Sequence, residues 1–185
     1  MNEAYAFAYD PAAVLGAIVG DYCWGLLLGA ISNNSLCQVK AFFDCQYDFN
    51  KPLCIESLEL ISILPISYAC AKGSIDVVNF LLHIGVDINI PGIDGKLPIH
   101  YTCDANERLD RKSDCVQALK ALIESKCDVN AVDNMGRTPI FLACEADDVN
   151  AMKLLIGNGC DVNIQTVCGD SPKKVACRNA KYWSY

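Results

Sequence analysis

Hydrophobic and polar positions recur with a near-constant period over residues 64–177. Runs with apolar residues at helical spacing, such as VVNFLL (77–82) and AMKLLI (151–156), lie between a proline and a D-x-N triplet. Apolar residues at positions i, i+3 and i+4 predict amphipathic helices. The triplets begin at Asp87, Asp128 and Asp161, and a proline follows each of these aspartates by 11 residues. A recurrence of this kind, with 33 residues from Asp128 to Asp161, predicts stacked helical units.

Each unit is expected to hold two helices. The strings LPISYAC, LPIHYTC, TPIFLAC and SPKKVAC start the first helix, where the missing N–H of proline costs nothing. Gly85 and Gly159 suit a left-handed cap at the end of the second helix. Lys126 takes this cap position in the middle unit, so some strain or a looser helix end is expected there. Turns between units are expected at Gly95, Gly136 and Gly169.

This pattern resembles the ankyrin repeat, whose signature runs T-P-L-H-x-A-A and later V-V-x-x-L-L-x-x-G-A-D-V-N. The resemblance covers residues 64–177 and implies an all-α solenoid of stacked helix pairs joined by β-hairpin-like loops. His100 stands at the T-P-L-H position, where the resemblance implies a structural hydrogen bond to a nearby loop. His83 is expected on the surface of a second helix.

Extending the register to both ends predicts four parts. Residues 1–21 form an N-terminal helical cap, and 22–63 form a degenerate first repeat with a long linker. Residues 64–170 hold three repeats with an insertion near 104–114, and 171–185 form a C-terminal half-repeat cap. In the first repeat Asn33-Asn34 replaces the helix-turn glycine, and the linker KPLCIESLELIS is expected to extend the next first helix or form a lid. The charged insertion is a solvated loop or helix end, with a docking element as the alternative.

The chain contains 12 cysteines but no C-x-x-C pair, and this spacing argues against zinc. Cys70, Cys103, Cys144 and Cys177 share one small first-helix position, and Cys127 and Cys160 share a second small position. These six are therefore predicted to be buried, reduced thiols, which indicates a reducing, cytoplasmic location. Cys168, on a loop tip, is the thiol expected to be exposed and reactive.

Composition excludes some classes of function. The formal net charge is −7 and no basic cluster is present, so nucleic-acid binding is not expected. Residues 12–31 are long and apolar enough to span a bilayer, but no basic flank anchors them, so a buried capping helix is favoured. The string GAIVGDYCWG is similar to the first motif of ADP-ribosylglycohydrolases, yet Asp21 alone would build no metal site.

No catalytic motif is present, and no cofactor or metal is expected. The resemblance implies a non-enzymatic, monomeric module, an adaptor or inhibitor, that binds another protein through loop tips and the exposed face of the first helices. In that face Tyr68, Tyr101 and Leu142 are expected to form an apolar stripe. The alternative is an array that positions a membrane-inserted or catalytic N-terminal segment. The residues assigned to the partner surface are Tyr68, Lys72, Ile93, Asp94, Lys96, Tyr101, Asn134, Met135, Arg137, Leu142, Glu145, Val167, Cys168 and Asp170.

Overall fold

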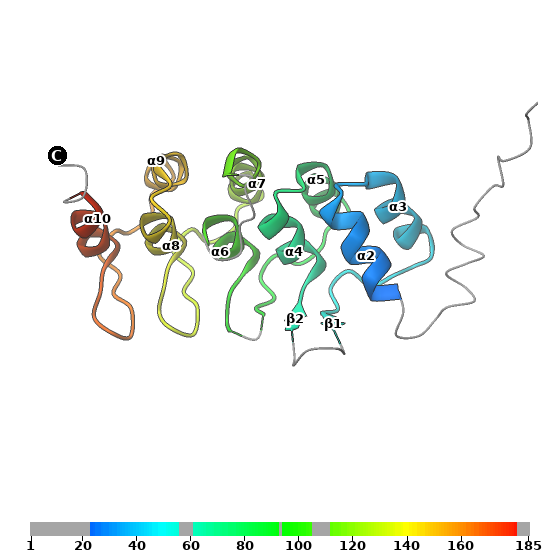
Figure 1. Cartoon of the computed structure of the whole chain (residues 1–185), viewed down its shortest axis with the longest axis horizontal. Helices are drawn as coiled ribbons and strands as arrows, with labels where there is room; N and C mark the ends of the chain where they lie inside the picture. Colours follow the sequence, from blue (N-terminus) through cyan, green and yellow to red (C-terminus); the bar gives the residue numbers. More distant parts are fainter. Residues whose placement is uncertain (1–22, 56–60, 93, 105–111, 181–185) are drawn as a thin grey trace, which may run out of the picture.

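A computed structural model describes residues 23–55, 61–92, 94–104 and 112–180. Its helices follow one another as antiparallel pairs, and the first and second helices of successive pairs stack into two rows (Figure 1). The first helices are α2 (Cys23–Ser32), α4 (Pro65–Lys72), α6 (Pro98–Cys103), α8 (Pro139–Glu145) and α10 (Pro172–Ala180). The second helices are α3 (Leu36–Asp44), α5 (Ile75–His83), α7 (Lys112–Glu124) and α9 (Val149–Gly157).

Local chemistry sets the helix starts. Pro139 begins α8, and the hydroxyl of Thr138 accepts a hydrogen bond from the backbone N–H of Phe141 at 3.4 Å. At α9 the Asp148 carboxylate accepts from the backbone N–H groups of Asn150 and Ala151 at 3.1 and 3.0 Å. Both caps satisfy N–H groups that have no partner inside the helix.

The second helices end in left-handed residues, as the sequence predicts. Gly85 and Gly159 have φ values of 80° and 81°. Lys126 adopts φ 63° at the equivalent position, and Asn34 adopts φ 51° in the turn between α2 and α3. A side chain with a Cβ atom is strained in this region, which confirms the expectation for Lys126.

The D-x-N triplets connect successive units. Within the triplet at Asp128, the carboxylate accepts from the backbone N–H of Asn130 at 2.8 Å. The side-chain oxygen of Asn130 then accepts from the backbone N–H of Asp161 at 2.7 Å, one unit further along. Asn50 makes the same link to Asp87 at 2.9 Å. The recurring asparagine is therefore a hydrogen-bond bridge between units.

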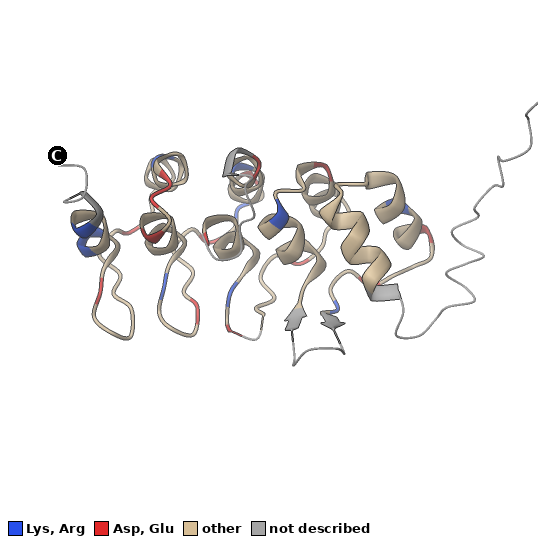
Figure 2. Cartoon of the chain, in the orientation of Figure 1, with Lys and Arg blue, Asp and Glu red and all other residues tan. Residues whose placement is uncertain are grey.

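The core runs along the seam between the two rows of helices. In α8 every residue from Pro139 to Cys144 is buried, because a first helix packs against its own second helix and against both neighbouring first helices. Basic and acidic residues are distributed along the outside with both signs interspersed (Figure 2). Among the described residues no helix is long and apolar enough to cross a membrane.

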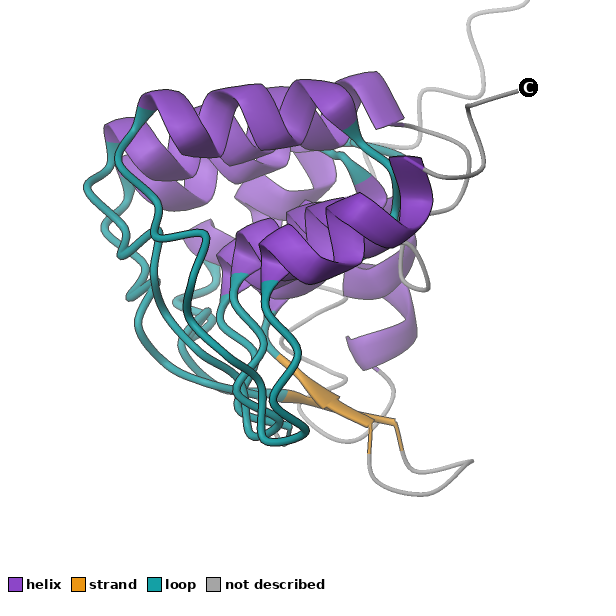
Figure 3. Cartoon of the chain, turned by 90° about the vertical axis from the view of Figure 1, so that its left-hand side faces the viewer, coloured by secondary structure: helices purple, strands orange, loops and turns teal. Residues whose placement is uncertain are grey.

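The linker after the first helix pair corrects the sequence-based expectation that it extends the next first helix. It forms a hairpin of β1 (Leu53–Ile55) and β2 (Ile61–Ile63), with Leu53 opposite Ile63 and Ile55 opposite Ile61. Apolar residues alternate with Cys54 and Ser62, which is the two-residue period of a strand. The hairpin projects on the same side of the helices as the loops between units (Figure 3).

Candidate partner-binding surface

Three projecting loops, called fingers here, separate the units: finger 1 (residues 92 and 94–96), finger 2 (133–137) and finger 3 (166–170). Backbone hydrogen bonds close each finger: Gly92 N donates to Lys96 O at 2.9 Å, Asp133 N to Arg137 O at 3.1 Å, and Thr166 N to Asp170 O at 2.9 Å. Each turns at a glycine with positive φ: Gly95 (75°), Gly136 (73°) or Gly169 (77°). Each finger is therefore a hairpin-like loop whose conformation is fixed by a closing backbone hydrogen bond and a glycine turn.

Backbone hydrogen bonds also join neighbouring fingers. Asn134 N donates to Asp94 O at 3.0 Å, and Val167 N donates to Met135 O at 2.9 Å. Gly95 lies so close to finger 2 that a Cβ atom there would meet the side chain of Asn134 and approach its backbone nitrogen to 2.9 Å. The three fingers consequently present one continuous surface.

Apolar side chains are exposed at the tips of fingers 2 and 3. Met135 is 53% exposed and Val167 is 80% exposed, and their backbones are directly hydrogen-bonded. Asn134, Asp94 and Cys168 are also exposed. Val132, just before finger 2, is exposed as well and is not among the residues predicted from the sequence. Its alternation with buried Asp133 is the signal that could have indicated it.

Lys96 is buried at the base of finger 1, which corrects its assignment to an exposed tip. Its ammonium lies 2.9 Å from the carboxylate of Asp104, 3.1 Å from that of Asp94, and 5.4 Å from the ring centre of Tyr101. Burial alone would lower the pKa of Lys96, but the hydrogen bonds to the two carboxylates outweigh this and raise it. Lys96 therefore anchors finger 1 to α6 from inside.

The other finger bases also hold ion pairs. In finger 2 both the Nε and an Nη atom of Arg137 lie 2.7 Å from the buried Asp133 carboxylate. In finger 3 Asp170 lies 2.6 Å from Lys174 and 3.2 Å from Arg178, both on α10. Hydrogen bonding to Lys174 is the largest influence that lowers the pKa of Asp170. Arg137 and Asp170 thus take part in fixing the fingers.

Two first-helix residues form a small cluster on α4. The Tyr68 hydroxyl and the Ser32 hydroxyl are 2.8 Å apart, and the Lys72 ammonium lies 5.1 Å from the centre of the Tyr68 ring. Both side chains are partly exposed. Glu145, at the end of α8, is exposed on the equivalent surface, and partial desolvation of its carboxylate raises its pKa.

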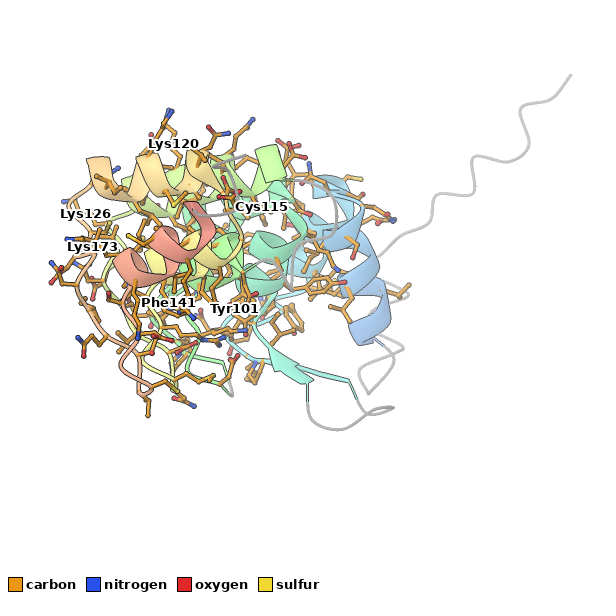
Figure 4. All side chains as sticks on the ribbon, turned by 60° about the vertical axis from the view of Figure 1, so that its left-hand side comes forward. Tyr101, Cys115, Lys120, Lys126, Phe141 and Lys173 are labelled. Carbon is orange, nitrogen blue, oxygen red and sulfur yellow. The ribbon has the colours of Figure 1, made fainter. Side chains whose placement is uncertain are left out.

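The expected apolar stripe is wrong at two of its three positions. Tyr101 is only 6% exposed and Leu142 only 2% exposed, since α6 and α8 are enclosed by neighbouring helices. Figure 4 shows Tyr101 and Phe141 lying between the helices and the fingers. Ile93, the remaining assigned tip residue, lies outside the described residues, as do Asp21 and most of the apolar segment 12–31.

The structural role of His100 is confirmed. The backbone N–H of Leu97 donates to Nδ1 at 3.1 Å, so the proton is on Nε2, which donates to Ala131 O at 3.1 Å. His83 is exposed, as expected.

The cysteine predictions hold in part. Cys70, Cys103 and Cys144 are buried and Cys168 is exposed, whereas Cys127 and Cys160 are only partly buried. Cys177 is exposed, contrary to expectation, because α10 lies at the end of the described stack. No group of three His, Cys, Asp or Glu side chains suited to a metal ion occurs within the described ranges.

Paired helices, hydrogen-bonded fingers and the recurring Pro, Gly and D-x-N positions define a helical repeat stack. A family model described as ankyrin repeats (3 copies) matches residues 66–166 and 111–182, and the chain belongs to this family. It is also 34% identical over 77 residues to protein phosphatase 1 regulatory subunit 12A of Mus musculus and of Rattus norvegicus. That stretch is 42% of this chain and 7% of each relative's length.

Proposed function

We propose that this chain is a non-enzymatic protein-interaction module that binds a partner protein through the finger tips and the neighbouring exposed first-helix residues. Membership of the ankyrin-repeat family supports a protein partner. The observation that carries the finger assignment is the pair Met135 and Val167, which expose apolar side chains on adjacent, hydrogen-bonded backbones. Exposed apolar anchors on a fixed backbone lose little conformational entropy on binding.

The ion pairs at the finger bases support this proposal. Lys96 and Arg137 hold their fingers in place, so the tips are ordered before a partner arrives. Lys72 and Glu145, at the C-terminal ends of α4 and α8, would add polar contacts from the first helices, as in many transient interfaces. This arrangement suits an adaptor, or an inhibitor that acts by occupying its partner.

A comparative capture experiment tests the proposal. The wild-type chain and the double variant Met135→Glu/Val167→Glu are used as baits in the same cell lysate, and the bound proteins are quantified by mass spectrometry. Ile156→Glu is the matched control, because Ile156 is 58% exposed on α9, away from the fingers. A partner retained by the wild type and by Ile156→Glu but lost from the double variant supports the proposal. Equal recovery on all three baits contradicts it.

The relatives' printed name suggests a first partner to test. We propose protein phosphatase 1, because the two relatives are named as regulatory subunits of this phosphatase. The purified phosphatase is added to the wild-type chain and to the double finger variant in a direct binding assay. Finger-dependent binding supports the assignment, and no binding to the wild-type chain excludes it.

A further inference from the structure

A second surface lies on the outer row of helices, formed by second helices rather than by fingers. A shallow groove of about 400 Å³ runs between α7 and α9. Its lining residues are Val116, Gln117 and Lys120 of α7 and Asn150, Lys153 and Leu154 of α9. On each helix these residues lie one, three or four positions apart, within about one turn, so each helix contributes one face.

The groove combines an apolar floor with basic edges. Val116 and Leu154 are partly buried and pack against the core, which leaves apolar surface open in the groove. Lys120 and Lys153 are exposed. The Lys120 ammonium lies 3.8 Å from the Glu124 carboxylate, and both side chains are about two-thirds exposed. This ion pair is therefore weak. Figure 4 shows Lys120 at the outer edge of the molecule.

The adjacent groove between α5 and α7 provides an internal comparison. It is smaller, about 290 Å³, and shares Lys120 and Gln117. Its lining also includes Glu124. Among the described residues, the lining of the α7–α9 groove contains two lysines and no carboxylate. The α7–α9 groove is therefore the more basic of these two grooves.

We propose that the α7–α9 groove is a second docking site, for an acidic amphipathic helix of a partner protein. The apolar side of that helix would cover Val116 and Leu154. One side of these two residues packs against the core, and the other side is open to the groove. Its carboxylates would meet Lys120 and Lys153. Helices that bind in a groove present an apolar stripe at i, i+3, i+4 and i+7, and such a stripe would lie over Val116 and Leu154 with Lys120 and Lys153 at its two sides. The lysines would set orientation and association rate, and the apolar floor would supply contact area.

Synthetic peptides of about 16 residues test this site, since shorter isolated helices are marginal in water. One peptide has leucine at i, i+3, i+4 and i+7 and glutamate elsewhere, and the matched peptide replaces every glutamate with lysine. Fluorescence anisotropy is measured with the full chain. The acidic peptide is expected to bind and the basic peptide not to bind. Binding should weaken as salt rises to ~0.15 M, because charges at the exposed groove edge are screened.

Single charge reversals localise the binding. Lys120→Glu and Lys153→Glu are each expected to weaken binding of the acidic peptide roughly tenfold, because like charges would then face each other. Lys51→Glu makes the same charge change at an exposed residue beyond α3 and should leave binding unchanged. Met135→Glu/Val167→Glu should also leave it unchanged, which separates this site from the fingers. No binding, equal binding of both peptides, or unchanged affinity in both groove variants overturns the proposal.

Discussion

At the scale of single residues, His100 links the start of one first helix to the next unit. Its Nδ1 accepts from Leu97 and its Nε2 donates to Ala131, 31 residues further on. Both hydrogen bonds require a neutral ring with the proton on Nε2. Burial lowers the pKa of His100, and the nearby Asp133 carboxylate opposes this shift without cancelling it. Folding therefore favours the neutral imidazole.

The sign of the resulting pH dependence follows from linkage. An unfolded histidine has a pKa of about 6.5, and the folded value is lower. The unfolded chain therefore binds the proton more tightly, and stability is lost as the pH falls from about 6.5 through the folded pKa. This contribution is at most about 1.4 kcal/mol per pH unit. Urea denaturation at pH 7.5 and 5.5 measures it.

His100→Gln provides the control for this prediction. The variant cannot titrate at this position, so its free energy of unfolding should change less between the two pH values than that of the wild type. His83→Gln, at an exposed site, should show the wild-type pH dependence. An unchanged pH dependence in His100→Gln would show that another group is responsible.

Sequence reasoning at this scale works best where backbone geometry restricts the residue. Gly85, Gly159 and Lys126 were predictable, because the repeat register identifies positions that need a left-handed residue. The burial of Tyr101 and Leu142 was not, because first helices are enclosed by neighbours from other units. The spacing of apolar residues within one helix does not show which helices of other units will cover it.

At the scale of elements, the fingers depend on close backbone approach. Gly95 needs a positive φ and also leaves no room for a Cβ atom beside Asn134. Gly159 has a similar φ of 81°, but nothing lies within 4 Å of the position where its Cβ would be. The two glycines thus separate the cost of the left-handed conformation from the cost of crowding between fingers.

Alanine substitutions at these glycines test the finger packing. Gly159→Ala is expected to cost about 1 kcal/mol, the penalty for a left-handed alanine. Gly95→Ala should cost roughly 2 kcal/mol more, because a shift of finger 2 adds to that penalty. The free energy of unfolding in urea gives both values. Equal costs would show that fingers 1 and 2 do not pack as closely as described.

The hairpin β1–β2 shows where element-scale prediction failed. The linker has apolar residues at several spacings, so its sequence is compatible with a helix as well as with a strand. The segment forms strands because β1 pairs with β2. Local propensity does not reveal this pairing. The linker therefore forms a hairpin beside the fingers and does not extend α4.

At the scale of the whole molecule, thiol reactivity reports how tightly the stack packs. Burial raises the pKa of Cys144 to about 11, and it raises that of Cys70 well above its usual range. Thiolates are the reactive species, so both residues should react slowly. Fast labelling is expected at the exposed cysteines, and slow labelling at the buried ones. The exposed set is Cys37, Cys45, Cys168 and Cys177, and the buried set is Cys70, Cys103, Cys115 and Cys144.

Timed labelling with N-ethylmaleimide at pH 7.5, read by peptide mass spectrometry, measures these rates. The same labelling in concentrated urea is the control, because unfolding should make the two sets react alike. Labelling of Cys70 as fast as that of Cys168 in the native protein would contradict a packed seam between the helix rows.

The central claim is that the finger tips bind the partner. Hydrogen–deuterium exchange of the chain, alone and with the partner identified by capture, tests it most directly. Amides of residues 133–137 and 166–170 should exchange more slowly in the complex, because Met135 and Val167 become covered. Slowed exchange confined to other parts of the chain, with both fingers unchanged, would contradict the account.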